Sequence, residues 1–179
     1  RLQSRGDAFT TLARSIVGQQ ISVKAAQSVW DKFAALVDGP THRIQPTAVL
    51  ALDTPALRSA GLSARKAEYL SDLARHFQDG AVHVRQWQTM DDESIIDELV
   101  VIRGIGRWTA EMFLIFHLMR PDVLPLDDLG LLKGISECYF SGEPVSRAEA
   151  RELGEGWAPY RSVATWYLWR SLDPLPVEY

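Results

Sequence analysis

Residues 102–110 read Ile-Arg-Gly-Ile-Gly-Arg-Trp-Thr-Ala and join two segments that have helical periodicity. Gly104 and Gly106 lie one residue apart, and glycine permits a positive φ and the close approach of another backbone. The helix that follows would present unpaired N–H groups at its N-terminus, which attract anions such as phosphate. Arg103 and Arg107 add positive charge at the same place. The segment is therefore either a phosphate-binding hairpin or a tight turn whose glycines serve only geometry.

Apolar residues recur at helical spacing through the rest of the chain. No segment alternates with the period of two that is typical of a half-buried strand. The sequence thus predicts an all-α fold of short helices. The first are expected to start near Phe9, Val23, Pro46, Thr54, Ser63 and Asp91. A further helix should run from Arg107 to about Met119, and the last three should lie near 129–139, 146–154 and 160–171.

Composition limits the class of protein. The 179 residues are 46% hydrophobic and 23% charged, which is ordinary for a globular domain. The net charge of −4 argues mildly against a surface coated in phosphate contacts, although it leaves room for a local basic face. No apolar run reaches the roughly 18 residues of a membrane span, so no membrane partner is expected, and no signal-peptide pattern opens the chain. The presence of only one cysteine predicts a cytoplasmic protein.

Cysteine and histidine usage excludes several kinds of site. Cys138 is the single cysteine, so neither an intrachain disulfide nor a cysteine-held iron–sulfur cluster can form. The four histidines show no metal-binding pair spacing, and no metal held by side chains is expected.

Two adjacent carboxylates, Asp127 and Asp128, follow Pro125 directly before the helix predicted at 129–139. One of them is expected to cap that helix by accepting hydrogen bonds from its first N–H groups. The other would then be available for chemistry.

Three blocks of the chain resemble the helix-hairpin-helix (HhH-GPD) DNA glycosylases, most closely the AlkA-like branch of DNA-3-methyladenine glycosylase II. They occur in the family's order, at 16–22, at 104–110 with 125–128, and at 157–162. The resemblance implies two helical lobes with the active-site cleft between them. It also implies a single domain over 1–179. Its parts would be a lobe at about 8–118, the helix-hairpin-helix at 91–119 within it, and C-terminal helices of the second lobe at 120–179.

The resemblance assigns roles to individual residues. In this family the catalytic carboxylate is an aspartate about twenty residues beyond the hairpin tryptophan, a spacing that matches Asp128 and Trp108. Relatives that also cut the strand have a lysine at the Trp108 position, which forms a Schiff base with the sugar, so no AP-lyase activity is expected. The implied base pocket comprises Trp108, Met112 and Trp169. The implied DNA contacts are Gln19, Gln20, Ser22, Arg103, Gly104, Gly106, Arg107 and Thr109.

The implied function is monofunctional excision of alkylated purines, 3-methyladenine and 7-methylguanine, from double-stranded DNA in base excision repair. The damaged nucleotide would be flipped out of the duplex, and an ionised Asp128 would stabilise the positive charge on the sugar as the bond breaks. No cofactor is expected apart from a monovalent cation, sodium or potassium, on hairpin carbonyls near Arg103 and Ile105. The protein is expected to be a monomer associated with the bacterial nucleoid.

Other interpretations stay open at this point. The chain could be a glycosylase for another damaged base, or a non-catalytic helix-hairpin-helix module that only binds DNA and needs neither Asp128 nor an aromatic pocket. Arg161 is expected to pair with a carboxylate, or else to contact DNA. Arg65 and Lys66 either contact the DNA backbone or form a solvated helix start.

Overall fold

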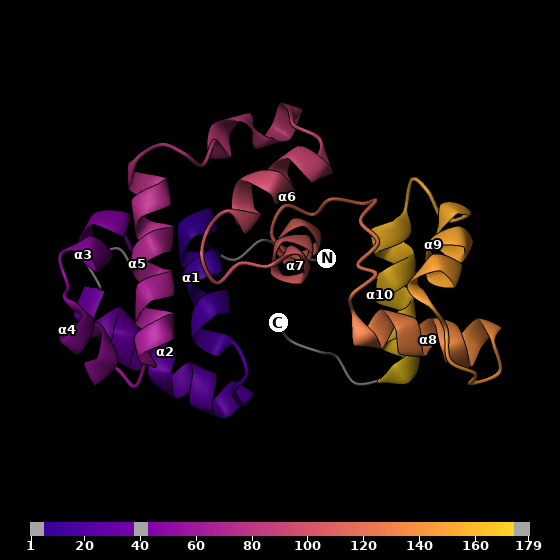
Figure 1. Ribbon diagram of the computed structural model, residues 1–179, viewed down its shortest axis with the longest axis horizontal. Coiled ribbons are helices and arrows are strands. Elements are labelled where there is room, and N and C mark those ends of the chain that lie inside the picture. Colours follow the sequence, from indigo (N-terminus) through magenta and orange to yellow (C-terminus); the bar gives the residue numbers. More distant parts are fainter. Residues whose placement is uncertain (1–5, 38–42, 174–179) are drawn as a thin grey trace. The chain divides into compact units, whose positions relative to one another are not determined.

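The computed structural model describes residues 6–37 and 43–173, and all the regular structure in this part of the chain is helical (Figure 1). The all-α prediction is confirmed. The helices are α1 (Ala8–Gly18), α2 (Val23–Val37), α3 (Pro46–Leu50), α4 (Thr54–Ser59), α5 (Ala64–Gln78), the 3₁₀ helix η1 (Val84–Thr89), α6 (Asp92–Val100), α7 (Arg107–Phe116), α8 (Leu129–Tyr139), α9 (Arg147–Glu155) and α10 (Arg161–Leu172). Within the described residues, no helix is both long enough and apolar enough to cross a membrane.

The chain divides into two compact units, Arg1–Phe113 and Leu114–Tyr179. The division falls inside α7, a few residues before the boundary at 118–120 that the sequence led us to expect. The cleft expected between two lobes stays a prediction.

In the first unit, α5 packs against α1, α3 and α4, and α1 also packs against α2 (Figure 1). The contact between α1 and α5 is apolar: Leu12 and Leu70 are fully buried, and the rings of Phe9 and Phe77 meet edge to face with centroids 5.3 Å apart. Helix α5 begins where the sequence predicted, and Ser63 caps it by accepting a hydrogen bond from the backbone N–H of Lys66.

Two features of the first unit's last helices differ from the prediction. The 3₁₀ helix η1 has no clear periodicity in the sequence, and it is held by the buried Trp87, whose Nε1 donates to Glu98 at 2.7 Å. Helix α7 ends at Phe116 instead of near Met119, which has a φ of 58°. The backbone N–H of Arg120 donates to the Leu114 carbonyl and ends the helix. The apolar pattern in the sequence therefore extends a few residues beyond the end of α7.

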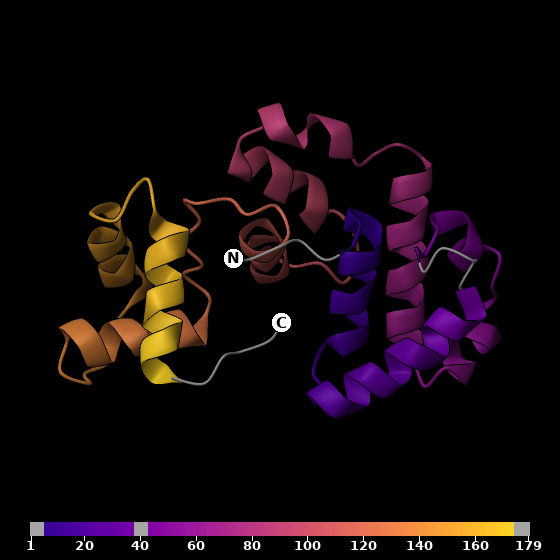
Figure 2. The same ribbon diagram turned by 180° about the vertical axis from the view of Figure 1, so that it is seen from behind.

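In the second unit, α10 lies beside α8, with α9 packed against α8 (Figure 2). Leu131 and Ile135 of α8 form a core with Leu168 of α10 and Ala150 of α9. Gly134 permits the close approach of α8 and α10, because a Cβ there would lie 3.0 Å from the Leu168 Cβ. This packing brings the start of α8 next to the end of α10.

Candidate functional site

Asp128, the expected catalytic carboxylate, is the N-cap of α8. Its Oδ2 accepts two hydrogen bonds of 2.7 Å, from the backbone N–H of Leu131 and from Nε1 of Trp169. The side chain of Asp128 is half-buried. The prediction gave capping and chemistry to different members of the carboxylate pair, whereas in the structure the candidate catalytic residue is itself the cap.

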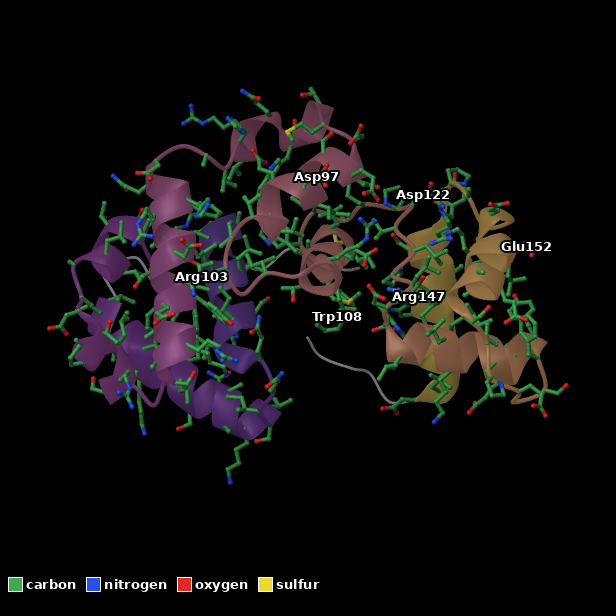
Figure 3. All side chains as sticks on the ribbon, viewed as in Figure 1. Asp97, Arg103, Trp108, Asp122, Arg147 and Glu152 are labelled. Carbon is green, nitrogen blue, oxygen red and sulfur yellow. The ribbon has the colours of Figure 1, made fainter. Side chains whose placement is uncertain are left out.

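The neighbouring Asp127 has a different environment. It is exposed, and its carboxylate forms an ion pair with Arg147, the first residue of α9 (Figure 3). The Arg147 guanidinium therefore compensates the charge next to Asp128. The cap of α8 is therefore Asp128 and not Asp127, the member of the pair that the predicted division of roles left for capping.

Trp169 lies on α10, and the Nε1 edge of its indole faces Asp128. One face of its indole stacks on Phe116, with ring centroids 5.6 Å apart and planes 12° apart. Gly130 lies against the same group: a Cβ there would be 3.1 Å from Asp128 Oδ2 and 3.1 Å from Trp169 Cδ1. The sequence placed Trp169 in the base pocket but held no signal for its bond to Asp128, 41 residues away.

Trp108 and Met112 lie one turn apart on α7, in the first unit. Trp108, labelled in Figure 3, is 44% exposed, and Met112 is half-buried. Thr109, an expected DNA contact, is half-buried beside them. Trp108 thus retains accessible surface that a ligand can contact.

The hairpin between α6 and α7 depends on Gly104. Its φ is 90°, and a Cβ at this position would lie 2.5 Å from the ring of Tyr69. The turn is closed by a hydrogen bond from the Ile105 N–H to the Ile102 carbonyl, and α7 begins directly after Gly106. Around Gly106 there is open space, with no heavy atom within 4 Å of the position that a Cβ would take.

Gln19 ties the end of α1 to this hairpin: its Nε2 donates to the Gly104 carbonyl at 2.7 Å. Lys66 supports the same place, because its ammonium donates to the carbonyls of Val17 and Gln19 at 2.8 and 2.7 Å. Partial burial lowers the pKa of Lys66. Both side chains therefore hold the hairpin and the α1 terminus in place, and Lys66 is neither the solvated helix start nor the outward DNA contact considered from the sequence.

The two hairpin arginines differ in how they are held. The Arg107 guanidinium contacts Glu93 of α6, with Nη1–Oε2 at 2.9 Å, and lies 3.7 Å from the buried carboxylate of Glu111. The hydrogen bonds from Arg107 hold the pKa of Glu93 below its usual range. Arg103 is more exposed, with its guanidinium 3.5 Å from Glu68 (Figure 3). Of the pair, Arg103 has the side chain that can reach a phosphate with less rearrangement.

The turn between α1 and α2 holds the remaining expected DNA contacts. Gln20 has a φ of 58° and is exposed, and the exposed Ser22 accepts a hydrogen bond from the Ala25 N–H at the start of α2. Because Gln19 bonds to the hairpin, this turn and the hairpin are adjacent.

Arg161 pairs with Asp122, as the favoured interpretation of the sequence predicted. The contact is bidentate, with Nε–Oδ1 at 2.8 Å and Nη2–Oδ2 at 2.9 Å, and it lowers the pKa of Asp122. It joins the start of α10 to the segment before α8.

Comparison with known proteins decides the family. Residues 13–159 match the HhH-GPD superfamily of base excision DNA repair proteins. The chain belongs to this superfamily. It is 31% identical over 175 residues to DNA-3-methyladenine glycosylase 1 of Schizosaccharomyces pombe. The aligned region covers 96% of this chain and 75% of that protein.

Solved structures agree with this HhH-GPD assignment. A DNA-3-methyladenine glycosidase from Bacillus halodurans superposes with a TM-score of 0.91 at 36% identity, over 97% of this chain and 79% of that one. A 3-methyladenine DNA glycosylase from Schizosaccharomyces pombe, in complex with abasic DNA, superposes with a TM-score of 0.80 at 29% identity. The superposition covers 99% of this chain and 88% of that one.

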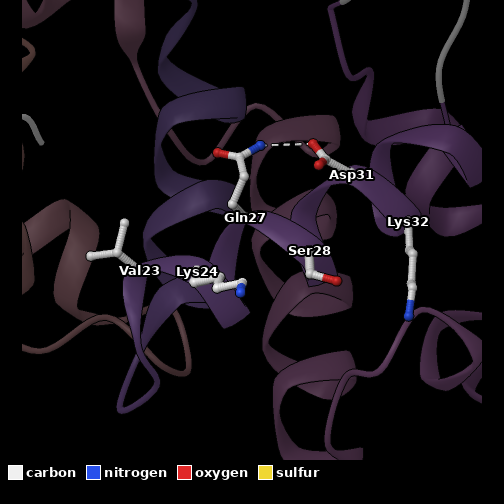
Figure 4. A pocket seen from close by; sticks show the side chains of 6 residues that line it. All are labelled: Val23, Lys24, Gln27, Ser28, Asp31 and Lys32. Carbon is white, nitrogen blue, oxygen red and sulfur yellow. Dashed lines mark hydrogen bonds between the residues drawn. The ribbon is translucent and has the colours of Figure 1, made fainter.

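Two further features of this HhH-GPD protein bear on its site. Within residues 6–37 and 43–173, no group of three His, Cys, Asp or Glu side chains could hold a metal ion. A shallow hollow of about 740 Å³ lies on α2 (Figure 4). All its lining residues come from that one helix, so it is an open helix face and contains none of the candidate catalytic groups; they are Val23, Lys24, Gln27, Ser28, Asp31 and Lys32.

Proposed function

We propose that the protein is a monofunctional DNA glycosylase that releases alkylated purines, including 3-methyladenine and 7-methylguanine, from double-stranded DNA and leaves an abasic site. The observation that carries the proposal is the carboxylate of Asp128, fixed at the start of α8 by two hydrogen bonds to one oxygen. The names of the relatives support the class of lesion. The proposal includes action as a monomer on the DNA of the bacterial cytoplasm.

The chemistry follows from the charge of the substrate. Alkylation at N3 or N7 gives the purine a positive charge, which weakens its bond to C1′ of the sugar. When that bond breaks, its electron pair leaves with the base and positive charge develops on the sugar. An ionised Asp128 stabilises this charge and orients the water that bonds to C1′ and gives up a proton.

DNA binding would use the hairpin backbone. The N–H groups at the start of α7 bind a phosphate, and the open space at Gly106 lets the phosphate approach. Arg103 adds charge, while Gln19 and Arg107 act through the hairpin that they hold. The exposed indole of Trp108 contacts the cationic base, an interaction worth about 0.5–2 kcal/mol. We propose that Gln20, which is exposed in the turn between α1 and α2, is the residue inserted into the duplex.

The proposed function is tested with methylated duplex DNA. The protein should release 3-methyladenine or 7-methylguanine, identified by chromatography, and leave unbroken abasic strands. Borohydride should trap no covalent protein–DNA adduct, because Trp108 has no amine and the exposed Lys133 lies 4.0 Å from Glu137 on its own helix. DNA binding without release of any base would favour the binding module, and release of neutral deaminated or oxidised bases alone would favour another lesion.

We also propose that the carbonyls of Arg103 and Ile105 bind a monovalent cation. Within the described residues, hydrogen bonds occupy the carbonyls of Ile102, Gly104 and Gly106 but not the two between them. Bound potassium or sodium would offset the negative charge of these carbonyl oxygens and attract a DNA phosphate. Affinity for abasic DNA should therefore be severalfold higher in potassium chloride than in N-methylglucamine chloride at the same ionic strength. Equal affinities in the two salts would contradict this proposal.

A further inference from the structure

We propose that Trp169 is a positioning residue that fixes the carboxylate plane of Asp128, and that Gly130 provides the space for this contact. The inference rests on the proposed function, because it concerns the catalytic carboxylate. It differs from the expectation that Trp169 serves as a wall for the base.

Oδ2 of Asp128 accepts hydrogen bonds from two different helices. The Leu131 N–H and the Trp169 Nε1 both donate to this oxygen at 2.7 Å. An aspartate side chain rotates easily about its last torsion, so one hydrogen bond leaves the carboxylate plane variable. A second donor, from another helix, restricts that rotation, and hydrogen bonds to an ionised acceptor are about twice as strong as neutral ones. Trp169 thereby orients the whole carboxylate.

The indole of Trp169 is itself held in place by a neighbouring ring. Phe116 stacks on one face of Trp169, with the planes 12° apart. Because Phe116 covers one face of the indole, only the opposite face is left for a base. The same stacking holds the indole so that its Nε1 edge points toward Asp128. The environment of Trp169 therefore suits an oriented N–H donor better than a surface for stacking.

Residue 130, next to the Asp128–Trp169 hydrogen bond, is a glycine and has no side chain. Gly130 is the second residue of α8 and does not have a left-handed backbone, so conformation does not require glycine. Space does: a Cβ would lie 3.1 Å from Oδ2 of Asp128, and 3.1 and 3.2 Å from Cδ1 and Nε1 of Trp169. These contacts are tighter than ordinary van der Waals contact. An alanine would push apart the two groups that the hydrogen bond joins.

The test uses Trp169→Phe, which keeps a ring against Phe116 and removes the N–H donor. The matched control is Trp166→Phe on the same helix, where the indole is 37% exposed and lies under Arg170. Two quantities are measured for the full chain: the single-turnover rate of 7-methylguanine release at saturating protein, and the Kd for abasic-site DNA. We expect Trp169→Phe to lower the rate about tenfold with Kd changed less than about twofold. Trp166→Phe should match the wild type in both.

Gly130→Ala provides a second test that leaves the indole in place. Its control is Gly156→Ala, where the new Cβ would make an ordinary contact, 3.5 Å from the Leu153 carbonyl. Gly130→Ala should lower the saturating rate without weakening DNA binding, and Gly156→Ala should change neither. If Trp169→Phe does not fold, Gly130→Ala decides alone.

Three results would overturn the inference. One is an unchanged saturating rate in both Trp169→Phe and Gly130→Ala. Another is a weaker Kd or an altered choice of released base at an unchanged rate, which would make Trp169 a wall for the base. The third is a lower unfolding temperature with no change in rate, which would make the contact merely structural. Failure of the proposed function is distinct, since then the wild-type protein itself would release no base.

Discussion

Asparagine in place of Asp128 should lower the single-turnover rate of base release by about 10²- to 10³-fold, the usual loss on removal of one preorganised electrostatic group. The substitution removes the negative charge that faces the developing positive charge on the sugar, while it keeps an oxygen that can accept from Leu131 and Trp169. The measurement is release of 7-methylguanine from methylated duplex DNA with protein in excess. The Kd for abasic DNA should stay within about threefold, because the hairpin is untouched.

The same variant separates chemistry from stability. Asparagine and aspartate are comparable N-cap residues, so the free energy of unfolding should change by less than about 1 kcal/mol in urea titrations. The matched control is Asp127→Asn, which breaks an exposed ion pair with Arg147 worth about 0–1 kcal/mol. It should keep most of the activity. An active Asp128→Asn beside an inactive Asp127→Asn would transfer the catalytic role to Asp127.

The features that could be predicted from the sequence are those determined by residues close together in the chain. Helix α5 is an example, because its start depends on Ser63 and its apolar face on residues three and four apart. The glycine hairpin likewise has its decisive residues within one short stretch. The order of the three blocks then pointed to the superfamily to which the chain belongs.

The features that could not be predicted join residues far apart in the chain. Gln19 bonds to Gly104 across 85 positions, and Trp169 bonds to Asp128 across 41. Such contacts depend on how helices pack, which the pattern of a single helix does not contain. The two carboxylates are a different case: a helix that starts at 129 already makes Asp128 its N-cap. The predicted division of roles failed because capping and charge stabilisation can use the same carboxylate.

Alanine in place of Gly104 should lower the free energy of unfolding by about 2–4 kcal/mol. Two costs add at this position. A φ of 90° is unfavourable for any residue with a Cβ, and that Cβ would lie 2.5 Å from Cδ2 and Cγ of Tyr69. The backbone must move to relieve the contact, and it carries the carbonyl that Gln19 binds. Affinity for abasic DNA should therefore fall at least tenfold together with stability, as measured by fluorescence anisotropy and urea unfolding.

The companion variant Gly106→Ala separates the two interpretations of the glycine pair. Gly106 lacks a left-handed φ, and no atom lies within 4 Å of its would-be Cβ, so the fold should tolerate alanine with a change of less than about 0.5 kcal/mol. If a phosphate approaches the backbone there, the new methyl group will still weaken DNA binding severalfold. Gly104 would then serve the geometry of the turn and Gly106 the approach of the ligand. Wild-type affinity in Gly106→Ala would instead mean that both glycines serve geometry alone, and the phosphate contact would have to be sought at Arg103.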